Sequence, residues 1–228
     1  MHNLRLAALT SLAMIAFAGN SLLCRAALTH THIDAASFTA ARLVSGALTL
    51  WLLIHLRREK TEKTGSWLSA FSLFVYAAGF SFAYISLPTA SGALILFGAV
   101  QTTMIGHGFW AGERLQGWQF IGLSLAVGGL VWLFLPGLSA PPLYGSILML
   151  GAGIGWGVYS LRGKNSADPT GITASNFIRS IPFAVVLSLC SIDKMVIDTT
   201  GIFYAILSGA ITSGIGYAIW YRVLPAMK

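Results

Sequence analysis

The chain has 228 residues, of which 56% are hydrophobic and only 9% are charged, whereas soluble globular proteins carry roughly 25% charged residues. This composition argues against a soluble fold and predicts an all-α, polytopic membrane protein. The net charge of +7 does not indicate a nucleic-acid partner, because the basic residues form no patch interleaved with aromatic side chains.

Charged and helix-breaking residues divide the chain into eight apolar runs, each long enough to cross a hydrocarbon core of roughly 30 Å as an α-helix. We expect transmembrane helices at 4–23, 35–56, 67–87, 88–112, 118–135, 143–161, 174–192 and 201–221. Two uncharged stretches are each twice the length of one span and must fold back. The first is expected to turn at Leu87-Pro88 and the second between Pro136 and Pro142.

The placement of Lys and Arg predicts the orientation, because cytoplasmic loops of membrane proteins are enriched in these residues. With the N-terminus inside, the cytoplasmic side holds Arg5, Arg57, Arg58, Lys60, Lys63, Arg114, Arg162, Lys164, Arg222 and Lys228. The opposite side holds only Arg25 and Lys194. We therefore expect a multi-pass protein of the inner (plasma) membrane with a cytoplasmic N-terminus, and the same placement accounts for the basic net charge.

A fixed offset of 137 residues relates positions in the two halves of the chain. It links Arg42 to Arg179, Gly79 to Gly216, Phe80 to Tyr217, Tyr84 to Tyr221 and Pro88 to Pro225. Several matches at one offset indicate duplication. A unit of five helices inserts its second copy upside down, which gives the inverted repeat typical of secondary transporters. We expect a first five-helix repeat at 1–137 and a second repeat at 143–228 that is incomplete, with three helices.

Four segments carry a family resemblance. GERLQGWQFIGLSLAVGGLVWL is similar to the segment that closes the repeat of the drug/metabolite transporter (DMT) superfamily, EamA type. AFAGNSLLCR and GWGVYSLRGK resemble the opening helix of that repeat, and GYAIWYRVLP resembles the end of its third helix. The resemblance implies a ten-helix inner-membrane carrier that works by alternating access and exports amino acids, metabolites or drugs. Eight spans depart from that pattern, so we expect truncation before the last two helices, or a homodimer or separate helix pair that completes the fold.

The acidic residues bear on what the chain does, and all seven fall at span ends or in loops. An intramembrane enzyme would therefore lack paired carboxylates for acid and base catalysis, and a proton-coupled pump would lack its usual relay. No P-loop motif supports ATP-driven transport, and His30 and His32 have no third metal ligand nearby. We expect a transporter rather than an enzyme, with no cofactor and no metal, acting on a small organic solute in the lipid bilayer. An inactive, truncated fragment is the alternative.

Arg42 and Arg179 are candidate substrate ligands. A guanidinium inside a membrane span is costly and tends to face a cavity, where it can bind a carboxylate or phosphate. Their inverted placement puts one near the outer mouth and one near the inner mouth, as a pair of gates or entry sites. In the alternative interpretation, each guanidinium reaches the lipid headgroups through its own stem.

The other candidates for the substrate cavity are uncharged. Asn20 and Gln101 are expected either to line a polar path or to join helices by hydrogen bonds. Tyr84, Trp156, Tyr159 and Tyr217 are expected either to form aromatic walls or to belong to the interfacial belt. The alternating residues Gly151, Gly153, Gly155 and Gly157 predict close packing of the sixth helix.

Overall fold

The computed structural model describes residues 2–57, 65–112, 117–134, 141–163 and 168–223. Several positions named above lie outside these ranges: Glu113 and Arg114 of the repeat-closing segment, Pro136-Gly137 at the second turn, and Pro225. The described residues form helices joined by short connections and contain no strand, which confirms the all-α prediction.

The helices are α1 (His2–His30), α2 (Ala35–Arg57), α3 (Trp67–Tyr84), α4 (Thr89–Trp110), α5 (Gly117–Phe134), α6 (Leu143–Gly163) and α7 (Pro169–Cys190). A 3₁₀ turn, η1 (Ile192–Lys194), leads into a last helical stretch of three parts: α8 (Thr199–Ile206), the π-helix η2 (Leu207–Ile215) and α9 (Gly216–Val223). Helix α7 begins five residues before the expected position 174. Asp168 caps it by accepting a 2.9 Å hydrogen bond from the Gly171 amide, and Pro169 fits the first turn.

Six helical stretches within the described residues are long and apolar enough to cross a membrane: α1 from Leu4, α2 to Leu56, α3, α4, α7 and the α8–η2–α9 stretch to Tyr221. Helices α5 and α6 are not among the six. In α6, six glycines together with Arg162 dilute the apolar character. The expectation of several apolar spans is therefore confirmed, whereas the number eight is not established by length and composition.

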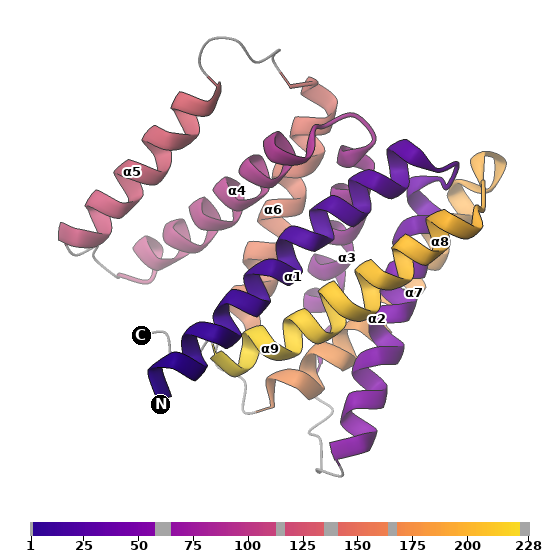
Figure 1. Ribbon diagram of the computed structural model, residues 1–228, viewed down its shortest axis with the longest axis horizontal. Coiled ribbons are helices and arrows are strands. Elements are labelled where there is room, and N and C mark those ends of the chain that lie inside the picture. The colour runs from indigo at the N-terminus through magenta and orange to yellow at the C-terminus, as the bar shows by residue number, and fades with distance from the viewer. Residues whose placement is uncertain (1, 58–64, 113–116, 135–140, 164–167, 224–228) are drawn as a thin grey trace.

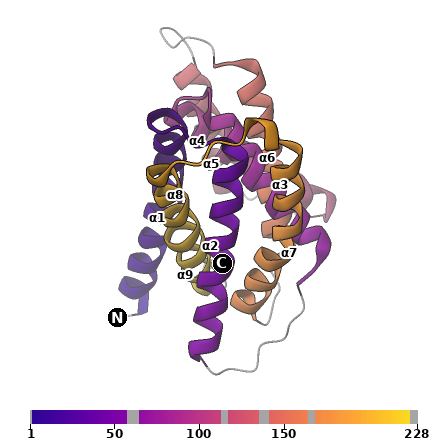
Figure 2. The ribbon, with the colours of Figure 1, turned by 90° about the vertical axis from the view of Figure 1, so that its right-hand side faces the viewer.

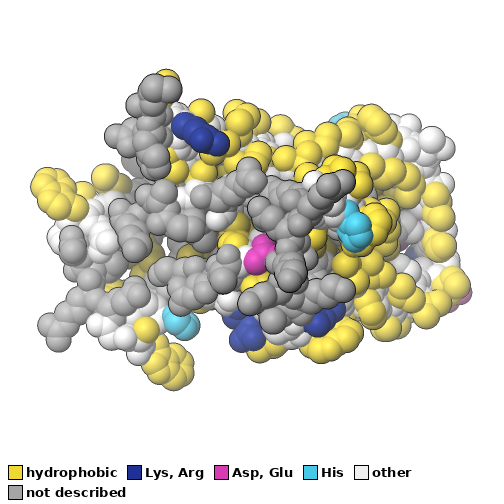
Figure 3. All heavy atoms as spheres, turned by 90° about the horizontal axis from the view of Figure 1, so that it is seen from below, with side chains coloured by type: hydrophobic (Ala, Val, Ile, Leu, Met, Phe, Trp, Pro, Cys, Tyr) yellow, Lys and Arg dark blue, Asp and Glu magenta, His cyan; other side chains and the backbone are white. Residues whose placement is uncertain are grey.

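Successive helices run in opposite directions and form one bundle (Figures 1 and 2). Helix α6 lies between α3 and α4, helix α2 packs against α7 and η2, and α1 lies along the α8–η2–α9 stretch. Among the described residues helix α5 makes few contacts, chiefly with α4, and it stands apart from most of the bundle (Figure 1). Figure 3 looks onto the end where α2 ends and α7 begins, with basic side chains at that end and apolar side chains along the flanks.

The glycines of α6 explain how that helix lies between two others. A side chain at Gly153 or Gly157 would press against α4, at Leu96 and Thr103, whereas one at Gly155 would press against the Ser72 carbonyl of α3. Small residues allow such close backbone approach between membrane helices. The predicted close packing is confirmed for these three glycines, while Gly151 faces open space.

Candidate functional site

A buried polar network lies where α1, α3 and η2 meet. The Asn20 side-chain oxygen accepts hydrogen bonds from the hydroxyls of Ser208, at 2.6 Å, and Thr212, at 3.2 Å. Its side-chain nitrogen donates a 3.1 Å hydrogen bond to the Tyr76 hydroxyl. Ser208 and Thr212 lie one turn apart in the π-helix, a rare geometry that often occurs at functional sites. Asn20 thereby joins three separate helical stretches.

Arg42 extends this network from α2. Its side chain is only 1% exposed, and its Nη2 donates a 2.9 Å hydrogen bond to the Tyr76 hydroxyl. The guanidinium carbon lies 5.0 Å from the centre of the Tyr76 ring and 4.9 Å from that of Phe80. Nη1 is buried without a hydrogen-bond partner. The guanidinium is therefore enclosed by the bundle and does not extend to the surface.

The charge of Arg42 is incompletely compensated. No ion pair joins it to any carboxylate of the described residues, and the nearest one along its own helix, Asp34, caps the start of α2. Two ring faces and the hydrogen bond to Tyr76 offset part of the desolvation cost, but no opposite charge neutralises the guanidinium and Nη1 has no partner. The environment of Arg42 therefore favours an added negative charge.

Aromatic side chains surround this network. Trp156 of α6 stacks on Tyr76 with ring centres 5.5 Å apart, and its other neighbours are Phe17 at 5.3 Å and Phe97 at 5.6 Å. Tyr217 of α9 lies 6.5 Å from Trp156, measured between ring centres. Both Trp156 Nε1 and the Tyr217 hydroxyl are buried without a hydrogen-bond partner. The site thus has three unpartnered polar atoms, each on a side chain that is at most 6% exposed.

Four of the predicted cavity residues, Asn20, Arg42, Trp156 and Tyr217, therefore meet in one place. Tyr84 lies further along α3, where its ring contacts Phe80 at 4.7 Å and its hydroxyl donates a 3.3 Å hydrogen bond to the Thr89 carbonyl. Gln101 is exposed on α4. We expected Gln101 to line the cavity with the others, but it takes no part in this network.

Arg179 lies apart from Arg42. The Arg179 guanidinium lies near Trp67, at the start of α3, whereas the Arg42 guanidinium lies against Tyr76 and Phe80, further along the same helix. Arg179 is half-buried, its guanidinium carbon lies 6.0 Å from the centre of the Trp67 ring, and its Nη1 is buried without a hydrogen-bond partner. The two guanidinium groups therefore do not share one site.

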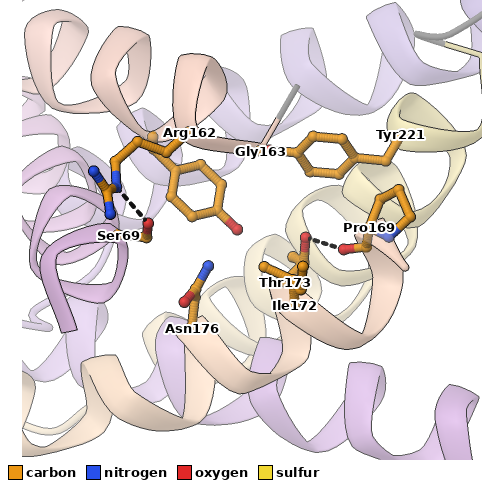
Figure 4. A pocket seen from close by; sticks show the side chains of 9 residues that line it. Ser69, Arg162, Gly163, Pro169, Ile172, Thr173, Asn176 and Tyr221 are labelled. Atoms are coloured by element: carbon orange, nitrogen blue, oxygen red, sulfur yellow. Dashed lines mark hydrogen bonds between the residues drawn. The ribbon is translucent and has the colours of Figure 1, made fainter. Parts of the chain in front are cut away.

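A small hollow opens between α3, α6, α7 and α9, on the side of the network toward the end shown in Figure 3. It has only about 10 Å³ of room for the centre of a water molecule, and its walls include Tyr159, Thr173 and Tyr221. Arg162 donates a 2.9 Å hydrogen bond from Nε to the Ser69 hydroxyl at its edge. The side chain of Asn176 points into it (Figure 4).

The hollow and the buried network are linked through one ring. Tyr159, which lines the hollow, lies 6.0 Å from Tyr217 between ring centres, and Tyr221 stacks on Tyr217 at 6.2 Å. Tyr217 therefore separates the hollow from the side chains around Arg42.

Three members of the network were not among the predicted residues. Tyr76 accepts hydrogen bonds from both Arg42 and Asn20, and the hydroxyls of Ser208 and Thr212 complete the bonding of Asn20. A signal for the last two was available, since Ser208 and Thr212 are hydroxyl residues four apart in an otherwise apolar span. Tyr76 gave no distinguishing signal, because nothing in its own helix sets it apart from the other six tyrosines.

The fold and site define the class of protein. Six apolar helices of membrane length, packed around a buried network with a positive charge, are those of a multi-pass α-helical membrane protein. No family model matches the chain. The chain is 54% identical over all of its 228 residues to the uncharacterized protein PA1977 of Pseudomonas aeruginosa, of which it covers 79%. It therefore belongs to the same family as PA1977.

Two further similarities are more distant. The chain is 21% identical over 204 residues to the uncharacterized transporter YoaV of Bacillus subtilis, an alignment that covers 82% of this chain and 69% of YoaV. A crystal structure described only as that of a protein superposes with a TM-score of 0.63 at 20% identity, covering 92% of this chain and 78% of its own. This second likeness concerns the fold alone.

Proposed function

We propose that the chain is a secondary transporter that binds a small organic solute at the network around Arg42 and exchanges it between the two sides of the membrane. The observation that carries this proposal is the enclosed guanidinium of Arg42, with Nη1 unpartnered among aromatic side chains. Ionisable groups inside membrane spans are rare and occur mainly where a substrate or ion passes. The distant similarity to YoaV, described as a transporter, adds support.

The proposal includes a topology. Eight spans with a cytoplasmic N-terminus put the end shown in Figure 3 in the cytoplasm of the inner membrane. The hollow beside Tyr159 then faces the cytoplasm, and the turn between α3 and α4 faces the other side. The basic residues counted by sequence support this orientation.

The proposal also includes the inverted repeat of an EamA-type member of the DMT superfamily. Its support is the matched packing of the two halves, since α1 lies along the α8–η2–α9 stretch as α6 lies along α3, and α2 faces α7. In an inverted repeat, the helices α4 and α5 that lie on the side of α6 would be matched by two equivalent helices on the side of α1. A second copy of the chain or a further helix pair would supply them, and export by alternating access is the proposed direction and mechanism.

Counterflow in proteoliposomes tests the function without a known coupling ion. Vesicles containing the full chain are loaded with an excess of one unlabelled solute and diluted into the same solute in labelled form, across a panel of amino acids, carboxylates and amines. We expect transient accumulation of at least one labelled solute, loss of that signal in Arg42→Gln, and its retention in the exposed-site control Arg5→Gln. No protein-dependent accumulation of any solute would contradict the proposed function.

A further inference from the structure

The hydrogen-bonding capacity left over at the buried network belongs mainly to donors. The Asn20 side-chain oxygen already accepts two hydrogen bonds, from Ser208 and Thr212. The Tyr76 hydroxyl oxygen also accepts two, from Arg42 and Asn20. A carbonyl oxygen and a phenolic oxygen each have no more than about two acceptor sites. The acceptor capacity of Asn20 and Tyr76 is therefore fully used, and the acceptor lone pairs that remain belong to the hydroxyls of Ser208, Thr212 and Tyr217.

Two of the three unpartnered atoms can act only as donors. Arg42 Nη1 and Trp156 Nε1 are buried without partners, and neither nitrogen can accept a hydrogen bond. The Tyr76 hydroxyl retains its own proton, and the buried Tyr217 hydroxyl has no partner. A ligand that satisfies this set must supply acceptor atoms.

The charge at the network points the same way. The described carboxylates lie at helix ends: Asp34, Asp168 and Asp198 cap α2, α7 and α8, and Asp193 lies in η1. None of them pairs with Arg42 in the described part of the chain. A ligand ammonium would therefore meet a guanidinium with no carboxylate to balance it, and like charges in a low-dielectric site repel strongly.

We propose that the site selects organic monoanions, namely carboxylates on an apolar or aromatic body, and discriminates against amines and zwitterionic amino acids. The carboxylate would be bound by Arg42 Nη1 with help from the indole or phenol donors, and the rings of Phe17, Phe80 and Trp156 would surround the body. This inference rests on the proposed function for the site's role in transport, and it narrows the expected substrates by excluding amino acids.

Competition binding with a matched series tests the substrate class. Labelled phenylacetate is bound to the full purified chain in detergent and displaced by phenylacetate, phenylalanine, phenethylamine or phenylacetamide, which share one ring and differ in charged groups. Labelled hexanoate against hexylamine repeats the comparison with an aliphatic body. We expect each carboxylate to bind, phenylalanine to be at least about tenfold weaker than phenylacetate, and the amines and the amide to be weaker still.

The variants assign the binding to the network. Arg42→Gln is expected to weaken carboxylate binding by about tenfold or more, and Arg5→Gln to leave it unchanged. The inference is overturned if phenylalanine or an amine competes as well as phenylacetate, if Arg42→Gln binds normally, or if neither carboxylate binds. If some solute shows counterflow but no carboxylate binds, the anion preference is rejected and the proposed transport function still stands. Carboxylate binding without any counterflow would reject the transport function and leave the anion preference standing.

Discussion

Arg42 and Tyr76, 34 residues apart on α2 and α3, share a 2.9 Å hydrogen bond from the guanidinium to the phenolic oxygen. This bond fixes one edge of the guanidinium and leaves Nη1 unpartnered. Tyr76 also accepts from Asn20, so one hydroxyl joins the charge on α2 to the amide on α1. The proposed binding site depends on this shared oxygen.

Replacing the buried charge should separate stability from function. We expect Arg42→Met to raise the Tm of the unliganded protein, because an unpaired buried ion is removed and a flexible apolar chain takes its place. Binding and transport of carboxylates should fall by about tenfold or more, since the strongest donor is lost. Thermal unfolding in detergent and the binding assay measure the two effects. A clear drop in Tm would mean that Arg42 is a structural residue.

Gly209 should be intolerant of a side chain. A Cβ there would collide with the Arg42 carbonyl oxygen and the Ser45 hydroxyl, so Gly209→Ala must push η2 away from α2. Overpacking of this kind costs about 1 to 3 kcal/mol. The matched control is Gly151→Ala in α6, where nothing lies nearby and the higher helix propensity of alanine contributes up to about 1 kcal/mol. Equal Tm values for the two variants would contradict the close approach of η2 to α2.

The hydrogen bond between Asn20 and Ser208 should appear as a coupling energy. In a double-mutant cycle with Asn20→Ala and Ser208→Ala, we expect about 0.5 to 2 kcal/mol of coupling, which is the range for buried hydrogen bonds between membrane helices. Thr29 serves as the control partner, because its exposed hydroxyl bonds to Arg25 within its own helix. Coupling near zero between Asn20 and Ser208, measured by denaturant unfolding, would show that α1 and η2 are not joined there.

The Tyr217 hydroxyl should matter to the ligand and not to the fold. It is buried without a partner, so Tyr217→Phe removes an uncompensated polar group and should leave Tm equal or higher. We expect carboxylate binding to weaken about tenfold or more, because a hydrogen bond to a charged acceptor contributes about 1.5 to 3 kcal/mol. Tyr144→Phe, at an exposed tyrosine of α6, is the control. Unchanged binding with Tyr217→Phe would place this hydroxyl outside the site.

The elements of this fold could be predicted from apolar length, because lipid leaves the backbone only helical hydrogen bonding. The ends of the helices were harder to predict, since α7 starts where Asp168 caps it and not where the apolar run begins. Asn20 and Arg42 were found because polar and charged residues stand out in apolar helices. Gln101 stood out equally and is exposed, because a helix that is apolar on all sides does not reveal which side faces the bundle.

The network around Asn20 could not be assembled from sequence for a related reason. Ser208 reaches Asn20 across 188 residues, and the contact depends on the π-helical geometry of η2, for which the sequence offers only a hydroxyl pair and several glycines. Tyr76 acquires its role from two neighbours on other helices. These relationships arise from packing, which periodicity in a single helix does not encode.

The most direct test of the account is the position of a bound carboxylate. Crystals of the full chain soaked with 4-bromophenylacetate would locate the bromine by anomalous scattering. The account predicts a peak among the rings of Phe17, Phe80 and Trp156, with the carboxylate within hydrogen-bonding distance of Arg42 Nη1. A peak confined to the hollow at Ser69 and Arg162, or carboxylate density away from Arg42, would contradict the claim that the buried guanidinium is the binding group.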